Sequence, residues 1–200
     1  METEGHRVEL WARPAALDDA AAIAEIYNQG IVDRTATFET EPRSAEERRA
    51  WLRGLADRYP AVVVEAGDKV VGWAAAGAYR PRDCYRGIGE ASVYVHRDWR
   101  GQGVGSLLLG ALIVEAERLG LWKLVSRIFV FNEASRALCR KHGFREVGVY
   151  EKHAKLDGRW IDCVIVERLI TANLGDGENR SDAVARSRTV APDTSAKGIG

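Results

Sequence analysis

The chain has 200 residues, the size of one domain or of one domain with a tail. Its 29 basic residues balance 29 acidic ones, which argues against bulk electrostatic binding of nucleic acid or of an anionic membrane. The three cysteines are far apart, the four histidines form no His-x-x-x-His pair, and no apolar run is long enough to span a bilayer. We therefore expect a reduced, cytoplasmic protein without disulfides, a metal site or a membrane segment.

The apolar pattern alternates between the period of a helix and that of a strand. In chain order it predicts a strand at residues 7–13, helices at 18–29 and 44–59, strands at 61–66, 70–79 and 88–95, a helix at 103–119, a strand at 124–130, a helix at 132–142, and strands at 144–153 and 160–169. Hairpins before and after a strand–helix–strand unit predict an α/β (α+β) fold in which a central mixed sheet is flanked by helices.

Particular residues predict where the helices begin and end. Gly30 is expected to end the first helix. Ser44 and Glu47 have the spacing of a capping box, which starts the second. Asn132 is expected to cap the start of the fourth helix and Gly143 its end.

The composition changes after residue 170. Residues 171–200 contain no aromatic side chain and are dominated by small and polar residues. Such a segment buries too little apolar surface to offset its chain entropy. We therefore predict a single domain at residues 1–170 and a disordered tail at residues 171–200.

A glycine-rich segment at residues 97–106 is the strongest local signal. It follows a predicted strand, opens a predicted helix, and has glycine at positions 101, 103 and 105. Glycines let the backbone approach a bulky anion closely, and the unpaired N–H groups at the start of a helix attract negative charge. The segment is interpreted as a pyrophosphate cradle or, alternatively, as a structural turn.

Two common phosphate-binding motifs do not fit this segment. A Walker loop ends in Gly-Lys-Ser/Thr, whereas Leu107 follows Gly105 and Ser106 here. The dinucleotide-binding fingerprint requires a third glycine where this chain has Ser106. The cradle is therefore expected to be of another type.

Two blocks carry a resemblance to a known family. Residues 100–105 follow the pattern Arg-x-x-Gly-x-Gly, and residues 132–135 follow Asn-x-x-Ser, with Gly-Phe at 143–144. Together they resemble the acyl-CoA-binding blocks of the GCN5-related N-acetyltransferase (GNAT) superfamily, over residues 8–170. The resemblance implies the GNAT fold, in which a bulge in the motif strand splays the central sheet.

A narrower resemblance concerns four further segments. They are Thr-Ala-Thr-Phe-Glu-Thr-Glu-Pro at 35–42, Arg-Pro-Arg-Asp-Cys-Tyr at 80–85, Glu-Ala-Ser-Val-Tyr-Val at 90–95 and Gly-Arg-Trp-Ile-Asp at 158–162. These are similar to the phosphinothricin acetyltransferase branch, whose acceptors include phosphinothricin, methionine sulfoximine and arsinothricin. The resemblance implies an N-acetyltransferase for a small amino acid of that type.

The family resemblance also implies where acetyl-CoA, the cosubstrate, binds. Amides of the motif strand would face the acetyl group and pantetheine, the loop amides would hold the pyrophosphate, and Asn132 would reach the pantetheine arm or act only as a helix cap. The side chain of Tyr94 belongs either to the core or to the pocket. The cofactor-binding residues expected on this basis are Val93, Tyr94, Val95, Arg100, Gly101, Gln102, Gly103, Val104, Gly105, Ser106, Asn132 and Ser135.

The resemblance assigns catalysis and acceptor binding as well. Glu90 occupies the position of the catalytic base; otherwise it is an exposed glutamate at a strand end. Arg80 and Arg82 would bind acidic groups of the substrate, with Arg82 favoured, and Phe38 would wall the pocket or anchor its loop. Cys139 stands where many relatives place the Tyr or His that protonates the leaving thiolate, so no dedicated general acid is expected.

Two alternatives to this function are an enzyme that acetylates a peptide or protein N-terminus and a catalytically silent acyl-CoA-binding module. The partners we expect are a small-molecule amine and a second copy of the chain in a homodimer, without nucleic acid or membrane.

Overall fold

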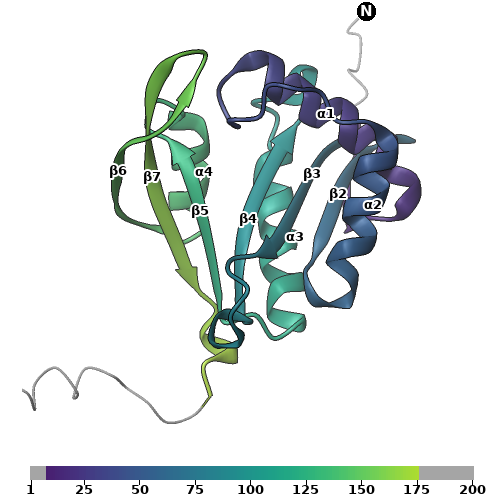
Figure 1. Cartoon of the computed structure of the whole chain (residues 1–200). Helices are drawn as coiled ribbons and strands as arrows, with labels where there is room; N and C mark the ends of the chain where they lie inside the picture. The colour runs from purple at the N-terminus through teal and green to yellow at the C-terminus, as the bar shows by residue number, and fades with distance from the viewer. Residues whose placement is uncertain (1–7, 176–200) are drawn as a thin grey trace, which may run out of the picture.

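A computed structural model describes residues 8–175, which form one mixed sheet with helices on both faces (Figure 1). The predicted order of strands and helices is confirmed. The strands are β1 (Leu10–Pro14), β2 (Ala61–Ala66), β3 (Lys69–Ala78), β4 (Ile88–Val95), β5 (Lys123–Phe129), β6 (Arg145–Leu156) and β7 (Arg159–Leu169). The helices are α1 (Ala20–Asp33), α2 (Ala45–Leu55), α3 (Val104–Arg118) and α4 (Glu133–Lys141).

The sheet has the strand order β1-β2-β3-β4-β5-β7-β6. Within it β4 and β5 are parallel, and the other neighbouring strands are antiparallel. The pairing of β4 with β5 covers Ile88–Glu90 against Lys123–Val125 and then stops. Beyond Glu90 the two strands diverge, so the predicted splayed sheet is confirmed (Figure 1).

The splay does not arise from a bulge between β3 and β4, as the family resemblance implied. These strands keep one register from the pair Gly72 and Val95 to the pair Ala78 and Gly89. The β4 strand therefore stays fully attached to β3, and the gap opens on its other edge.

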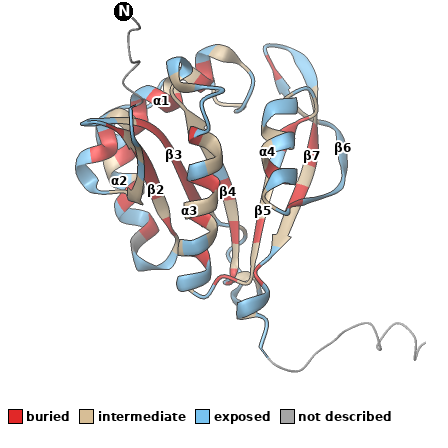
Figure 2. Ribbon diagram, turned by 180° about the vertical axis from the view of Figure 1, so that it is seen from behind, coloured by how far each residue is buried: buried red, intermediate tan, exposed pale blue. Residues whose placement is uncertain are grey.

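Helices on the two faces of the sheet bury two apolar cores (Figure 2). Alternate residues of β2 point to opposite faces, with Val62 and Val64 beneath α3 and Val63 beneath α1 and α2. The larger core also contains Leu108, Leu109 and Leu112 of α3. This packing fixes α3, and hence the glycine-rich loop before it, against β4.

Most predicted helix signals are confirmed. The amide of Glu47 donates to Ser44 Oγ, and the amide of Ser44 donates to a carboxylate oxygen of Glu47, as in a capping box. Asn132 Oδ1 accepts from the amide of Ser135, and Gly143, after α4, has a φ of 76°.

The expected end of the first helix at Gly30 is wrong. The α1 helix continues to Asp33 and is followed by Arg34, which is left-handed with a φ of 56°. Gly30 is buried beside Tyr94, and an ideal Cβ on Gly30 would lie 2.9 Å from Cε1 of that ring. Close packing, rather than helix termination, explains this glycine.

The first residues of the predicted tail contact α3. Thr171–Asn173 form a short 3₁₀ turn, and Asn173 Nδ2 donates to the carbonyl oxygens of Glu117 and Leu121, each at 2.8 Å. These bonds satisfy carbonyls at the end of α3 and just beyond it. Residues 176–200 of the predicted tail, and residues 1–7, lie outside the described residues. Between residues 8 and 175, no helix combines the length and apolar character needed to cross a membrane.

A matched pair of glycine substitutions tests the packing of α1 on Tyr94. Gly30→Ala is expected to lower the free energy of unfolding by about 1–3 kcal/mol, because the added methyl would clash with the Tyr94 ring, which already packs against Trp73 and Tyr27. Gly54→Ala, in α2 with nothing within 4 Å of the position a Cβ would take, is expected to leave stability unchanged or to raise it by up to about 1 kcal/mol. Denaturant unfolding measures both; equal effects of the two substitutions would contradict the packing.

Candidate functional site

Two cavities meet where β4 and β5 diverge. The larger, of about 420 Å³, reaches the α1 and α2 side and is called the α1-side cavity here; the smaller, of about 80 Å³, is lined by α4 and is called the α4-side cavity. Residues that line both are Ala36, Ala91, Ser92, Tyr94, Ser126, Arg127 and Phe129. The gap in the sheet therefore joins spaces on its two faces, the arrangement expected for a reaction between two separately bound molecules.

The glycine-rich loop presents unpaired amides. Gly101 and Gly103 have φ values of 74° and 89°, the left-handed region that glycine adopts without strain. The amides of Ser106 and Leu107 donate to the carbonyl of Gly103, but no hydrogen bond among the described residues uses an N–H of residues 101–105. Exposed N–H groups at the start of α3 form a ready site for an anion.

Side chains at the rim tie the loop to α1. Asp33 Oδ1 accepts a hydrogen bond from Arg97 Nη2 at 3.0 Å, and Asp33 Oδ2 forms an ion pair with Arg100 Nη1 at 2.7 Å. Arg100 Nε also donates to the carbonyl of Val95, so this predicted cofactor-binding guanidinium is already engaged by the protein. The loop shape is thus set without a ligand, and its backbone amides are the groups left free.

Other side chains of the loop hold it internally. Gln102 Nε2 donates to the carbonyl of Asp98 at 2.7 Å, and Ser106 Oγ lies 2.9 Å from His142 Nε2 of the α4 C-cap. An ideal Cβ on Gly105 would lie 3.3 Å from Leu138, so this glycine permits α3 and α4 to approach. The structure therefore brings the predicted residues of the loop together. Their side chains are mostly engaged within the protein, and their backbone amides remain free.

The free edge of β4 supplies a second set of amides. His96 N–H donates to the carbonyl of Val71 across the β3 side. Because amide directions alternate along a strand, the N–H of Tyr94 also points toward β3, whereas those of Val93 and Val95 point into the gap. The expectation that the Tyr94 amide faces the acetyl group is therefore wrong, because in this register the Tyr94 N–H is directed at β3.

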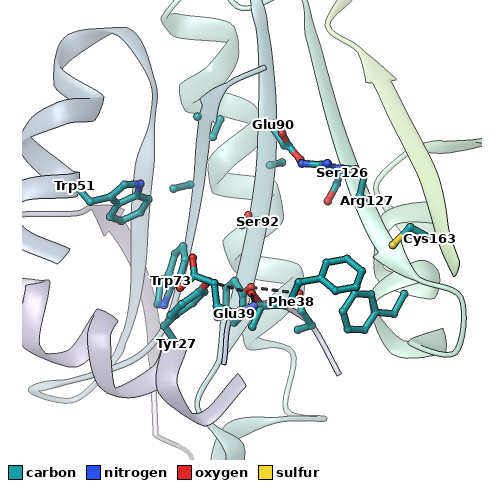
Figure 3. A pocket seen from close by; sticks show the side chains of 18 of the residues that line it. Tyr27, Phe38, Glu39, Trp51, Trp73, Glu90, Ser92, Ser126, Arg127 and Cys163 are labelled. Atoms are coloured by element: carbon teal, nitrogen blue, oxygen red, sulfur yellow. Dashed lines mark hydrogen bonds and ion pairs between the residues drawn. The ribbon is translucent and has the colours of Figure 1, made fainter. Parts of the chain in front are cut away.

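Glu90 lies at the last residue pair before the strands diverge, and Arg127 of β5 faces it (Figure 3). Arg127 Nε and Nη2 both approach Glu90 Oε1, at 2.8 and 2.5 Å. Among the described residues, no hydrogen bond engages Glu90 Oε2. Arg127 thus holds Oε1 in place, and Oε2 is free to accept a hydrogen bond from a bound group.

Aromatic rings wall the α1-side cavity. Tyr94 stacks on Trp73 with ring centroids 4.8 Å apart and meets Tyr27 edge-on at 4.9 Å. Phe38 packs against Phe129 at 4.7 Å, so it both anchors its loop and lines the cavity. Tyr94 likewise belongs to core and pocket at once, and its burial raises the pKa of its hydroxyl.

The two candidate substrate arginines differ in position. Arg80 lines a further cavity, of about 430 Å³, that also contains Glu90, Ser126 and Arg127. Arg82 is exposed and lines none of these three cavities of the described chain. The structure thus brings Arg80, rather than the favoured Arg82, close to the candidate base.

On the α4 side, Asn132 and Ser135 line the smaller cavity as predicted. The Asn132 amide is engaged by the protein, however, because Oδ1 caps α4 and Nδ2 donates to the carbonyl of Thr35 at 3.0 Å. Cys139 lines the same cavity, and burial raises the pKa of its thiol to about 11. A protonated thiol is a poor nucleophile, so this buried cysteine is unsuited to covalent catalysis.

Sequence reasoning missed three polar residues of the site, namely Arg127, Ser126 and Arg48. Both cavities contain Ser126 and Arg127, and the α1-side cavity contains Arg48. A charged residue inside the apolar run of β5 was the available signal for Arg127. Between residues 8 and 175, no group of His, Cys, Asp or Glu side chains is arranged to hold a metal ion.

Comparison with known proteins identifies the family of this chain. Residues 23–144 match the acetyltransferase (GNAT) family. The chain belongs to the GNAT acetyltransferase family. It is 37% identical over 157 residues to the L-methionine sulfoximine/L-methionine sulfone acetyltransferase of Pseudomonas aeruginosa, covering 78% of this chain and 91% of that one. It is 39% identical over 158 residues to the phosphinothricin N-acetyltransferase of Alcaligenes faecalis, covering 78% and 80%.

A solved GNAT structure shares the architecture. The phosphinothricin acetyltransferase of Sinorhizobium meliloti, determined in complex with acetyl-CoA, superposes with a TM-score of 0.74 at 32% identity, covering 80% of this chain and 88% of that one. The GNAT fold and the resemblance to the phosphinothricin acetyltransferase branch are therefore both confirmed.

Thiol labelling tests the environment of Cys139. Because its pKa is raised to about 11, almost none of this thiol is ionised at pH 8, whereas Cys84 is exposed. Iodoacetamide at pH 8 is expected to modify Cys84 and to spare Cys139, with Cys139 labelling increasing only as the pH approaches 11. Mass spectrometry of tryptic peptides measures both; faster labelling of Cys139 than of Cys84 at pH 8 would contradict the assignment.

Proposed function

We propose that this protein transfers an acetyl group from acetyl-CoA to the amino group of a small amino acid of the phosphinothricin, methionine sulfoximine or arsinothricin type. The observation that carries the proposal is the junction of two cavities at the gap between β4 and β5, with Glu90 at this gap and the unpaired amides of residues 101–105 at the start of α3. The relatives named above support this acceptor class.

The free amides of residues 101–105 fit the pyrophosphate of acetyl-CoA, because they form a cluster of donors that no group between residues 8 and 175 satisfies. The N–H groups of Val93 and Val95 would face the pantetheine and acetyl end, and the α4-side cavity beside Asn132 and Ser135 would take the arm. When bound, acetyl-CoA supplies the acetyl group as a reactive thioester.

Glu90 is proposed to take the proton that the acceptor must lose. An α-amino group has an ordinary pKa near ~8, so most of it is protonated at neutral pH and cannot attack. The unengaged Oε2 of Glu90 would accept that proton directly or through one water, while Arg127 holds Oε1 in place. The nitrogen lone pair would then attack the thioester carbonyl. The C–S bond would break as the thiolate leaves without a dedicated acid, and the second proton that the nitrogen loses would go to this thiolate or to solvent.

Backbone amides would stabilise the negative charge that develops on the carbonyl oxygen. The N–H groups of Val93 and Val95 point into the gap and are held rigidly, because β4 pairs along its whole length with β3. A donor arranged in this way is typically worth roughly 3 kcal/mol to the transition state. The gap therefore serves both to join the cavities and to expose these donors.

We make further proposals about the extent of the domain, the cellular location, the biological role and the oligomeric state. We propose that residues up to about Ile170 form one acetyltransferase domain, that the protein acts in the cytoplasm, and that it confers resistance to amino-acid toxins. Two chains are proposed to associate through β6 and β7, whose exposed apolar side chains are Val147, Val149, Tyr150 and Trp160.

An acceptor screen tests the proposed reaction. Thiol release from acetyl-CoA is measured with phosphinothricin, methionine sulfoximine, arsinothricin, the common amino acids and peptides with free N-termini. Turnover with the first three is expected. Turnover with peptides alone would favour a peptide acetyltransferase, and tight acetyl-CoA binding without any turnover would favour a silent binding module.

Substitution of the candidate base tests its role. Glu90→Gln is expected to lower kcat about 100-fold or more at pH 7 while leaving the Kd of acetyl-CoA within about twofold. The loss should shrink at higher pH, where more of the free amine exists. The exposed Glu117→Gln serves as the control and should behave as wild type. An unchanged rate for Glu90→Gln at neutral pH would refute the assignment.

A further inference from the structure

One guanidinium of the α1-side cavity has no anionic partner within the described part of the chain. Arg48 of α2 is only 8% exposed, and its Cζ lies 3.8 Å from the centre of the Tyr27 ring and 5.4 Å from that of Trp51. Among residues 8–175 it forms no ion pair, and its buried Nε has no hydrogen-bond acceptor. The aromatic faces hold the cation in place but leave its N–H groups unused.

A less buried arginine of the same chain is fully paired. Arg13, whose side chain is more exposed at 30%, contacts Asp19 at 2.7 Å and Glu65 at 2.6 Å. Burying an arginine normally requires such pairing, because an unpaired charge loses its hydration without compensation. The environment of Arg48 therefore indicates that its partner comes from outside the protein.

A second unused donor lies in the same cavity. Trp73 is 3% exposed, and its Nε1–H has no acceptor among the described residues. Trp73 and Arg48 account for two of the four buried side-chain polar atoms that lack a hydrogen-bond partner in residues 8–175, and both line the α1-side cavity. Each is a donor only, so together they suit a group rich in acceptor oxygens.

The strand register places one of the two donors, Trp73, relative to the gap. Trp73 pairs with Tyr94 in the sheet, two residues along β4 from Ser92, which lines both cavities. Two residues of a strand span about 7 Å. This offset suits an amino acid whose amine lies at the gap and whose extended side chain ends in oxygen atoms.

The charge around this end of the cavity favours an anion. Glu39 also lines it, but Glu39 Oε2 accepts Arg43 Nε at 2.7 Å, so that carboxylate is already neutralised. An oxyanionic side group entering the cavity would therefore meet the unpaired Arg48 as the dominant charge.

We infer that Arg48, together with the indole N–H of Trp73, binds the oxygen-bearing side group of the acceptor and so determines its specificity. This rests on the proposed function, because it takes the acceptor to be an amino acid acetylated at the gap. The assignment gives the side group a binding site separate from Arg80, which lies beside Glu90 and would be left for the carboxylate.

The test compares two ligands that differ in the side group. Phosphinothricin carries a phosphinate, and L-methionine is a thioether without such oxygens. Calorimetric titration of each into the CoA-bound enzyme gives a Kd that does not depend on turnover. Arg48→Lys and Arg48→Gln are expected to raise the Kd of phosphinothricin about 10- to 100-fold and that of L-methionine less than about threefold.

The controls separate binding from folding. Arg49→Lys alters the exposed neighbouring arginine of the same helix and should leave both Kd values unchanged. Trp73→Phe keeps an aromatic ring, removes the N–H, and should weaken phosphinothricin selectively, which provides a second test if the Arg48 variants do not fold. Acetyl-CoA affinity should be unaltered in each variant that folds.

Three results would overturn the inference: an unchanged Kd for phosphinothricin in the variants that fold, equal weakening of both ligands, or no binding of phosphinothricin to the wild type. Failure of the proposed function is a different result. If the wild type binds phosphinothricin through Arg48 but does not acetylate it, the binding role stands and the proposed reaction fails.

Discussion

The divergence of β4 and β5 after Glu90 is the constraint on which the rest of the site depends. The strands pair only from Ile88 to Glu90, and the gap beyond joins the cavities on the two faces of the sheet. A closed parallel pair would satisfy the outward amides of β4 and separate the two spaces. Because β4 remains paired with β3 throughout, the exposed amides are rigid, and little reorganisation is needed when charge develops beside them.

The parts around this gap are fixed by contacts from distant segments. Asp33 at the end of α1 holds Arg97 and Arg100 of the glycine-rich loop, and Gly30 allows α1 to pack on Tyr94 of β4. The same helix thus positions the phosphate-binding loop and the aromatic wall of the acceptor cavity. A preformed site of this kind avoids the entropic cost of ordering a loop when a ligand binds.

Local patterns predict most of the fold, since strand and helix periods and the capping residues Ser44 and Asn132 act within a few residues. Long-range contacts decide the rest. From the sequence alone Gly30 is predicted to end a helix, whereas the structure shows that it allows close packing against Tyr94. The direction of the Tyr94 amide depends on the register between β3 and β4. The motifs indicate Glu90, but its pairing with Arg127 and the lack of a partner for Arg48 within residues 8–175 emerge only when separate elements come together.

The most direct measurement is an amide NMR titration of the protein with coenzyme A. The account predicts large chemical-shift changes and slowed hydrogen exchange at residues 101–105, with shifts at Val93 and Val95, and little change at Tyr94, whose N–H points toward β3. Saturating coenzyme A that leaves the amides of residues 101–105 unperturbed would contradict it.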